Sequence, residues 1–306
     1  MSKTAFLFPG QGSQYAGMGK SLAKAYPEAA RVFEQADAAL GFALSKLCFE
    51  GPEDQLKLTE NQQPALLAVS TAAHAVLKRG CVQTDFVAGH SLGEYSALVA
   101  AGSLDFAEAL RIVRNRGRYM QEAVPAGVGA MAALLKLPEG RLDAILAEAA
   151  QGEVVTAANL NTSEQIVIAG HAGAVARASE LAKAAGARRA LPLPVSAPFH
   201  CPLMKPAQER LKADLDAATF RDLAVPLVNN YQAREIRTGA EAREGLYQQV
   251  PNPVRWSESI AYLASQGVTR FIEVGPGSVL TGLLRGIDPA LAGLKFGEAA
   301  DGEKLL

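Results

Sequence analysis

The chain has 306 residues, of which 49% are hydrophobic and 20% are charged. This composition is ordinary for a globular protein with a sizeable core, and the length allows one large domain with an insertion, or two domains. The formal net charge is −1, so no long-range field favours nucleic acid or an anionic membrane, and neither is expected as a partner.

The cysteines Cys48, Cys81 and Cys201 show no Cys-x-x-Cys spacing and no metal-ligand pattern. We therefore expect reduced thiols in a cytoplasmic protein, and no metal site. The apolar stretch before Pro9 is too short for a secretory signal. No run approaches the ~18 apolar residues of a membrane-spanning helix.

The first part of the chain alternates apolar strand patterns with helical ones. The first strand ends in a glycine-rich turn over 9–14, and a turn at the carboxyl end of a strand is a usual place for a site. A helical pattern begins at Gln62-Gln63-Pro64, where proline suits a first turn. The predicted strands cover 4–8 and 86–88, and the predicted helices cover 19–40, 62–79, 94–100 and 105–123.

The middle of the chain, residues 127–195, has a different order of elements, β-α-β-β-α-β. This order is the ferredoxin-like pattern, so we expect a ferredoxin-like subdomain inserted into a core formed by residues 1–126 and 196–306. The predicted strands cover 130–137, 154–160, 165–169 and 188–195, and the predicted helices cover 138–150 and 172–185.

The last part of the chain resumes the α/β pattern, with strands over 226–229 and 271–274 and a helix over 279–284. Strands that alternate with helices predict an α/β fold with a mostly parallel sheet covered on both faces. The tail from about Leu294 has little periodicity, and we expect it to be loosely held.

A Gly-x-Ser-x-Gly motif occupies residues 89–93, between the apolar run 86–88 and the helical pattern over 94–100. This context is typical of a nucleophile elbow, in which a sharp turn lifts a serine hydroxyl clear of the sheet. The two glycines remove the Cβ atoms that would crowd the turn. Ser91 is therefore a candidate nucleophile, and a serine that only caps the helix is the alternative.

A serine nucleophile needs a base, and the chain has four histidines. His74 lies in a helical pattern and His171 at a helix start, so packing and capping roles are expected for them. His90 precedes the serine, where local geometry points its ring away from the hydroxyl. His200 ends a loop stiffened by two prolines and is the candidate base; a loop histidine with structural contacts only is the alternative.

The remaining parts of a serine site are less clear from the residues. Asp105 and Asp143 fall between the serine and His200, but neither sits in an obvious strand-end loop, so a pair oriented by a neutral group is expected. An oxyanion hole needs two donors aimed at one point. Leu92 supplies one backbone N–H at the helix start, and Gln11 is the natural candidate for the second.

Arginines cluster at positions 111, 114, 116 and 118. An arginine that faces the site would bind a carboxylate through two hydrogen bonds. Spacing alone does not choose which of the four does so.

At this point the motifs identify a family. The chain closely resembles the malonyl-CoA:acyl-carrier-protein transacylases, in order and with few gaps, from about residue 4 to about 290. The acyltransferase segments of polyketide and fatty-acid megasynthases share the pattern. The matching segments are Phe8-Pro9-Gly10-Gln11-Gly12-Ser13-Gln14, residues 89–97 and 116–121, Phe199-His200, Asn252-Pro253-Val254 and Glu273-Val274-Gly275-Pro276-Gly277.

The resemblance implies a core similar to patatin-like and α/β hydrolases, with a ferredoxin-like subdomain. It implies a malonyltransferase of fatty acid biosynthesis that needs no cofactor, because the coenzyme A thioester is a substrate. The partners would be malonyl-CoA and, transiently, an acidic acyl carrier protein, docked with help from Lys183, Arg188 and Arg189. The implied site residues are Ser91 as nucleophile, His200 as base, Gln11 and Leu92 as oxyanion hole, Arg116 as ligand of the malonyl carboxylate, and Gln249, whose backbone carbonyl orients the histidine.

The implied reaction passes through a malonyl-serine ester in ping-pong fashion. Phe199 resembles the residue that precedes the histidine in malonyl-selective members. A serine thioesterase or esterase that releases the acyl group to water is the alternative function. A non-catalytic subunit that only holds carrier protein is a third.

Overall fold

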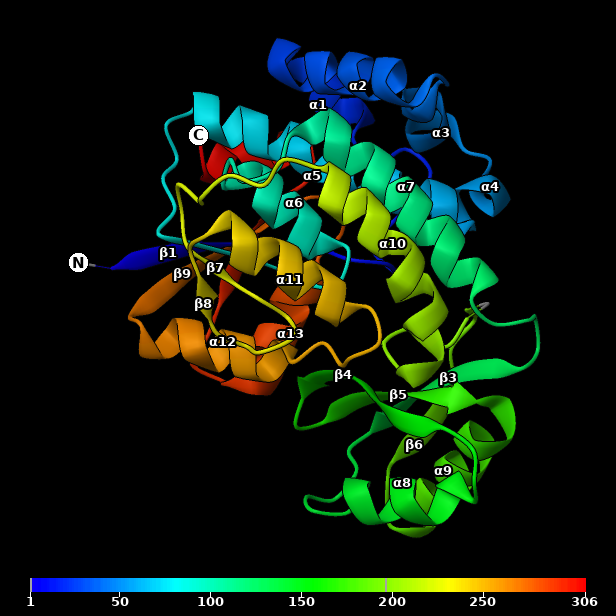
Figure 1. Cartoon of the computed structure of the whole chain (residues 1–306). Coiled ribbons are helices and arrows are strands. Elements are labelled where there is room, and N and C mark those ends of the chain that lie inside the picture. Colours follow the sequence, from blue (N-terminus) through cyan, green and yellow to red (C-terminus); the bar gives the residue numbers. More distant parts are fainter. Residues whose placement is uncertain (1, 196) are drawn as a thin grey trace.

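The computed structural model describes residues 2–195 and 197–306. The predicted domain limits at positions 1 and 196 lie outside these ranges. A six-stranded sheet forms the centre of the larger part of the molecule, and all of its neighbouring strands are parallel except the last pair (Figure 1). Its order is β10 (Gly293–Phe296), β9 (Val268–Val274), β1 (Lys3–Phe8), β2 (Phe86–Gly89), β7 (Leu227–Val228) and β8 (Glu235–Ile236).

Helices cover both faces of this sheet because alternate side chains of each strand point to opposite sides. Phe6 and Phe8 of β1 pack in one apolar cluster, and Ala5 and Leu7 pack in another. The α/β class with a mostly parallel sheet is therefore confirmed. On the side of Ala5 and Leu7 lie α12 (Trp256–Ser265) and α13 (Val279–Ile287). On the side of Phe6 and Phe8 lie α1 (Lys20–Ala25), α2 (Pro27–Leu40), α3 (Leu44–Glu50), α4 (Glu53–Lys57), α5 (Thr59–Arg79), α6 (Gly93–Ala100), α7 (Phe106–Glu122), the 3-10 helix η1 (Pro202–Met204), α10 (Lys205–Ala217) and α11 (Gly239–Gln249).

A second, antiparallel sheet of four strands lies beside the larger part, with two helices on its outer side (Figure 1). Met131 and Ala133 pack with the main core, whereas Ala132 and Leu134 pack against the unit's own helices. This sheet is therefore covered on both faces, one by each part of the molecule. Its strand order is β4 (Val155–Thr162), β5 (Gln165–His171), β3 (Gly129–Leu135) and β6 (Arg189–Pro192), and its helices are α8 (Leu142–Ala150) and α9 (Ala172–Ala184).

The expectation of a loosely held tail is wrong. β10 adds a parallel strand to the edge of β9, and a 3-10 helix, η2 (Ala299–Lys304), follows it. The carboxylate of Glu298 accepts hydrogen bonds from Tyr15 and Ser21, which ties this segment to the beginning of the chain. A short edge strand of four residues carries too little periodicity to be seen in the sequence.

Several predicted elements have different limits. The helix expected over 19–40 is two helices that meet at Tyr26, because Pro27 begins the second one. Pro64 lies inside α5 instead of at its first turn, since the helix begins at Thr59. No helix in the described ranges is both long enough and apolar enough to cross a bilayer.

Candidate active site

Ser91 stands at the turn between β2 and α6, with its backbone in the left-handed region at φ 51°. The glycines of the motif are required by close approach of the backbone. A Cβ on Gly89 would lie 1.9 Å from the carbonyl carbon of Gly93, and a Cβ on Gly93 would lie 2.0 Å from the carbonyl oxygen of Phe8. The sharp turn is therefore possible only because residues 89 and 93 have no side chain.

His200 meets this serine from 109 residues further along the chain. Its Nε2 lies 2.7 Å from Ser91 Oγ, and its Nδ1 lies 3.0 Å from the backbone carbonyl oxygen of Gln249. A carbonyl can only accept, so Nδ1 carries the proton and Nε2 presents a lone pair to the hydroxyl. The neutral carbonyl occupies the place that a carboxylate holds in a hydrolase triad.

The imidazole of His200 is held in its neutral form. Burial, and then the positive charge of Arg116, lower the pKa of His200 to about 3. The neutral ring therefore has a lone pair free to accept a proton at neutral pH.

Arg116 reaches the serine from the middle of α7 and is fully buried. Its Nη2 donates to Ser91 Oγ at 3.1 Å and to Gln249 Oε1 at 2.9 Å, and its Nη1 donates to Gln63 Oε1 at 2.7 Å. Its Nε has no hydrogen-bond partner within the described ranges. The Nε–H of this guanidinium is therefore a buried donor that remains able to take a ligand.

Gln11 and Leu92, the predicted oxyanion-hole residues, both lie near the serine. Leu92 follows the serine directly as the N-cap residue of α6, and it is buried. Gln11 follows β1 and lines the same cavity as Ser91 and His200. The side chain of Gln11 also donates to Gln62, which holds the turn against α5.

The cavity over the serine is small, about 110 Å³, and both polar and apolar side chains line it. It adjoins a larger cavity of about 680 Å³, with which it shares Gln11, Leu193, Val195 and Phe199. This arrangement provides a narrow inner chamber and a wider approach. Residues from both parts of the molecule line the inner chamber: Gln11, His90, Ser91, Met131, Asn159, Leu193, Val195, Phe199 and His200.

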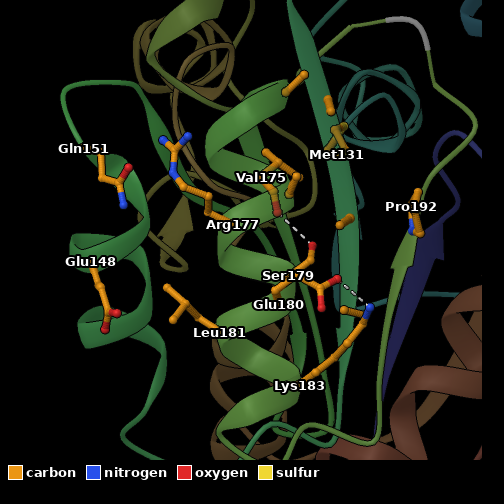
Figure 2. Close-up of a pocket in the computed structure, with 15 residues that line it drawn as sticks. Met131, Glu148, Gln151, Val175, Arg177, Ser179, Glu180, Leu181, Lys183 and Pro192 are labelled. Atoms are coloured by element: carbon orange, nitrogen blue, oxygen red, sulfur yellow. Dashed lines mark hydrogen bonds and ion pairs between the residues drawn. The ribbon is translucent and has the colours of Figure 1, made fainter.

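A separate groove of about 680 Å³ crosses the smaller unit between α8, α9 and the edge of its sheet (Figure 2). Figure 2 shows Glu180 and Lys183 of α9 paired within it, with Arg177 toward α8. It holds neither Ser91 nor His200. Lys183 thus faces a different cavity from Arg188 and Arg189, which line one between the smaller unit and α13.

The other candidate residues lie away from the hydroxyl or serve another purpose. The ring of His90 bonds through Nε2 to Asn161 Oδ1 at 2.8 Å, and His74 packs edge-on against Phe6 and Phe8. His171 Nδ1 accepts from the backbone of Val154 at 2.9 Å. These contacts give each ring a structural partner.

The remaining candidates are also placed elsewhere. Asp105 caps α7 by accepting from the backbone of Ala107 and Glu108. The Cys201 thiol donates to the carbonyl of Pro198, and burial raises its pKa to about 11, so it is not activated as a nucleophile. Among the residues that the structure describes, no cluster of three or more histidine, cysteine or acidic side chains could hold a metal ion.

Sequence reasoning missed three side chains that build the site: Gln63, Asn230 and Glu94. Asn230 Oδ1 accepts from the backbone N–H of Ser91 at 2.7 Å, and its Nδ2 donates to the carbonyl of Gly89 at 2.7 Å. A signal was present, because Asn229-Asn230 follows directly on an apolar strand. Polar residues at the carboxyl end of a strand in an α/β sheet often face a site.

Comparisons with known proteins agree on one family. A family model described as an acyl transferase domain matches residues 5–289. The chain is 52% identical over 292 residues to the malonyl CoA-acyl carrier protein transacylase of Bacillus subtilis (strain 168), which covers 95% of this chain and 92% of that relative. It is 49% identical over 299 residues to the protein of that name from Escherichia coli (strain K12), which covers 97% of each.

Solved structures give the same result. A crystal structure of an acyl carrier protein S-malonyltransferase from Vibrio cholerae superposes with a TM-score of 0.97 at 45% identity, over 100% of both chains. The complex PlMCAT:AntF contains a type II PKS acyl-carrier protein with its malonyl-transacylase. It matches with a TM-score of 0.97 at 44% identity, over 100% of this chain and 99% of that one.

Proposed function

The chain belongs to the acyl transferase family, and we propose that it moves a malonyl group from coenzyme A to the phosphopantetheine thiol of an acyl carrier protein. One observation carries the proposal. A buried serine and histidine lie 2.7 Å apart, beside a buried guanidinium whose Nε–H has no partner among the described residues. The pair accounts for acyl transfer, and the guanidinium accounts for an acyl group that ends in a carboxylate.

In the first half-reaction, Ser91 Oγ attacks the thioester carbonyl of malonyl-CoA while His200 Nε2 takes the hydroxyl proton. The carbonyl oxygen becomes an oxyanion that accepts from the backbone N–H groups of Gln11 and Leu92. The C–S bond then breaks, the imidazolium returns its proton to the departing sulfur, and malonyl-Ser91 and coenzyme A remain. The carbonyl oxygen of Gln249 holds the imidazole through Nδ1 in both directions of proton transfer.

In the second half-reaction, the phosphopantetheine thiol gives its proton to His200 and attacks the ester. Collapse of the adduct returns the proton to Ser91 Oγ and leaves malonyl on the carrier. The wider cavity beside the inner chamber gives an extended thiol-bearing arm a path to the serine. The alternative acceptor is water, which would make the protein a thioesterase.

Selectivity for malonyl falls to Arg116 in this proposal. A buried guanidinium without a charged partner favours a ligand that supplies a carboxylate. The apolar side chains of Met131 and Phe199 line the chamber around the serine. Acyl chains that end in a methyl group leave the Nε–H of Arg116 unpaired.

The finer architecture is part of the same proposal. We infer a hydrolase-like core of residues 1–126 and 196–306 and a ferredoxin-like unit of residues 127–195. The strand order β4-β5-β3-β6, with two helices on one face, supports that description of the smaller unit. We also propose that the reaction uses no cofactor besides its thioester substrate, and that the protein works in the cytoplasm, where the free thiols Cys48, Cys81 and Cys201 stay reduced.

The test is the intact mass of the protein after incubation with malonyl-CoA, with and without holo acyl carrier protein. We expect a single malonyl adduct that disappears when the carrier is added, with malonyl then found on the carrier. Ser91→Ala should form no adduct, since it lacks the attacking oxygen. An adduct on Ser91→Ala would refute the nucleophile, and loss of the adduct as free malonate at the same rate with or without carrier would identify a thioesterase.

A further inference from the structure

Glu94 is a buried carboxyl group that the reaction above does not use. It lies three residues after the serine on α6 and has no exposed surface. Burial raises the pKa of Glu94 to about 7, although hydrogen bonds from Asn230 and Gln249 and the charge of Arg116 oppose that shift. Burying a carboxyl group destabilises the fold unless hydrogen bonds or a nearby opposite charge offset the cost of desolvation.

The contacts of Glu94 lead to Gln249. Its Oε2 accepts from Gln249 Nε2 at 2.9 Å and from the backbone N–H of Asn230 at 2.9 Å. Its Oε1 has no hydrogen-bond partner in the described part of the chain. The carboxyl group touches neither Ser91 Oγ nor the imidazole by any hydrogen bond described for it, so its effect on the site passes through these neighbours.

The amide of Gln249 has two chemically different ends, and each faces a fixed partner. Nε2 faces the acceptors Glu94 Oε2 and the carbonyl oxygen of Ser91, the latter at 3.1 Å. Oε1 faces Arg116 Nη2 at 2.9 Å. A guanidinium can only donate, and Glu94 Oε2 accepts whether the carboxyl group is ionised or carries a proton on Oε1, so these partners select one of the two amide orientations.

We propose that Glu94 is a positioning residue for substrate selection. By accepting from Gln249 Nε2, it holds the amide with its oxygen on Arg116, and so fixes the plane in which the guanidinium meets the carboxylate of the acyl group. Without Glu94, Nε2 keeps only its longer contacts, to the carbonyl oxygen of Ser91 at 3.1 Å and to Asn230 Oδ1 at 3.3 Å, so the amide is held less firmly with its oxygen on Arg116. The inference rests on the proposed role of Arg116 in binding malonyl.

The test compares malonyl-CoA and acetyl-CoA as acyl donors in single-turnover acylation of the whole protein. Glu94→Leu should lower the rate with malonyl-CoA relative to acetyl-CoA roughly tenfold, the scale of a hydrogen bond to a charged group. Glu94→Gln keeps a carbonyl acceptor for Gln249 Nε2 and should recover most of that ratio. In an Arg116→Ala background, Glu94→Leu should leave the ratio unchanged, because the group through which it acts is gone.

A matched control is Glu273→Leu, which removes another fully buried carboxyl group. Glu273 accepts from the backbone N–H groups of Leu280 and Thr281 at the start of α13, so this variant should melt earlier and keep the malonyl-to-acetyl ratio. An equal loss with both donors in Glu94→Leu would overturn the proposal and make Glu94 structural only. If Arg116→Ala itself kept the ratio, the proposed role of the arginine would fail instead.

Discussion

Arg116 is a buried cation whose hydrogen-bond partners, the side chains of Gln63, Ser91 and Gln249, are uncharged. Desolvation lowers the pKa of Arg116, while the charge of Glu94 opposes that shift. Because guanidinium stays protonated at any ordinary pH, the site keeps a positive charge that neutral amides solvate only in part. This incompletely solvated charge is the basis of the proposed role of Arg116 in binding a substrate carboxylate.

Substitution of Arg116 should change the preference between acyl donors more than the acylation step itself. Arg116→Ala removes the partner of the substrate carboxylate, so we expect acylation by malonyl-CoA to fall on the order of 10²-fold more than acylation by acetyl-CoA. The measurement is the pair of acylation rates from intact mass at short times. Arg118→Ala is the control, since that side chain is exposed two positions further along the same helix. Equal losses on the two donors would contradict the assignment.

At the scale of elements, the turn from β2 to α6 depends on the absence of two Cβ atoms. Gly89→Ala would force a methyl group into the carbonyl of Gly93, at 1.9 Å in the present backbone. We expect a loss of several kcal/mol in the free energy of unfolding, as for other overpacked or strained sites, together with loss of acylation. Denaturant unfolding and intact mass measure the two effects.

The matched control for this turn is Gly282→Ala, in α13. A Cβ there would meet nothing within 4 Å, and alanine favours the helix by about 1 kcal/mol. That variant should be as stable as the parent or more so, with unchanged acylation. Wild-type stability in Gly89→Ala would show that the backbone can move away, against the steric argument.

At the scale of the whole molecule, the histidines couple stability to pH. Burial lowers the pKa of His74 to about 4 and, with the charge of Arg116, that of His200 to about 3. A histidine whose pKa is lowered by folding binds fewer protons in the folded state, so its contribution to stability is complete above about pH 6.5 and falls as the pH drops. Glu94, with a raised pKa, contributes a slope of the opposite sign.

The contribution of His74 can be isolated by comparing the pH dependence of stability in a variant with that in the parent protein. His74→Phe removes a titrating ring from the contacts with Phe6 and Phe8, so the variant should lose less stability than the parent between about pH 6 and pH 5. The expected difference in slope is at most about 1.4 kcal/mol per pH unit, the value for one proton. Urea unfolding at each pH measures it, and the contributions of Glu94 and His200 cancel in the comparison. Parallel pH curves would contradict the argument.

The basic residues at the end of the smaller unit predict a docking surface for an acidic carrier protein. Arg188 and Arg189 are exposed at the start of β6, and Lys183 is exposed on α9. Charge reversal at the arginines should raise the KM for the carrier and leave acylation by malonyl-CoA unchanged, because it adds repulsion far from the serine. Lys183→Glu tests the other groove, and Lys24→Glu on α1 is a control of equal charge. An unchanged KM in the reversals at Lys183, Arg188 and Arg189 would remove this surface.

The sequence carried the parts of the site that depend on local geometry. The elbow at Ser91 is predictable because its strand, turn and helix are contiguous in the sequence. His200 is predictable as the base because it ends a loop stiffened by two prolines, and the fold brings that loop to the serine. The sequence alone does not identify Gln63, Glu94 and Asn230 as site residues. Each lies on a different element, and only the packing of α5, α6 and the end of β7 brings them together.

The same reasoning explains the errors in the fold. The α/β class followed from alternating apolar patterns of ordinary length. The edge strand β10 has four residues and follows a loop, so its pairing with β9 decides its conformation and its own sequence does not. Two helix limits differ at prolines. Pro27 begins a second helix within the stretch predicted as one, and Pro64 lies in a helix interior although a first turn was predicted for it, since a proline fits a first turn and, less often, an interior.

Neighbouring residues of strand β3 belong to different environments, the chamber around the serine and the core of the smaller unit. Met131 lines the chamber around the serine, whereas Ala132 and Leu134 on the same strand pack in the separate hydrophobic core of the smaller unit. A change of side chain at the first position can alter which acyl groups fit, and changes at the others alter only whether the unit holds its shape. Descendants of this sequence could therefore explore new substrates at one residue while neighbouring residues keep the scaffold intact.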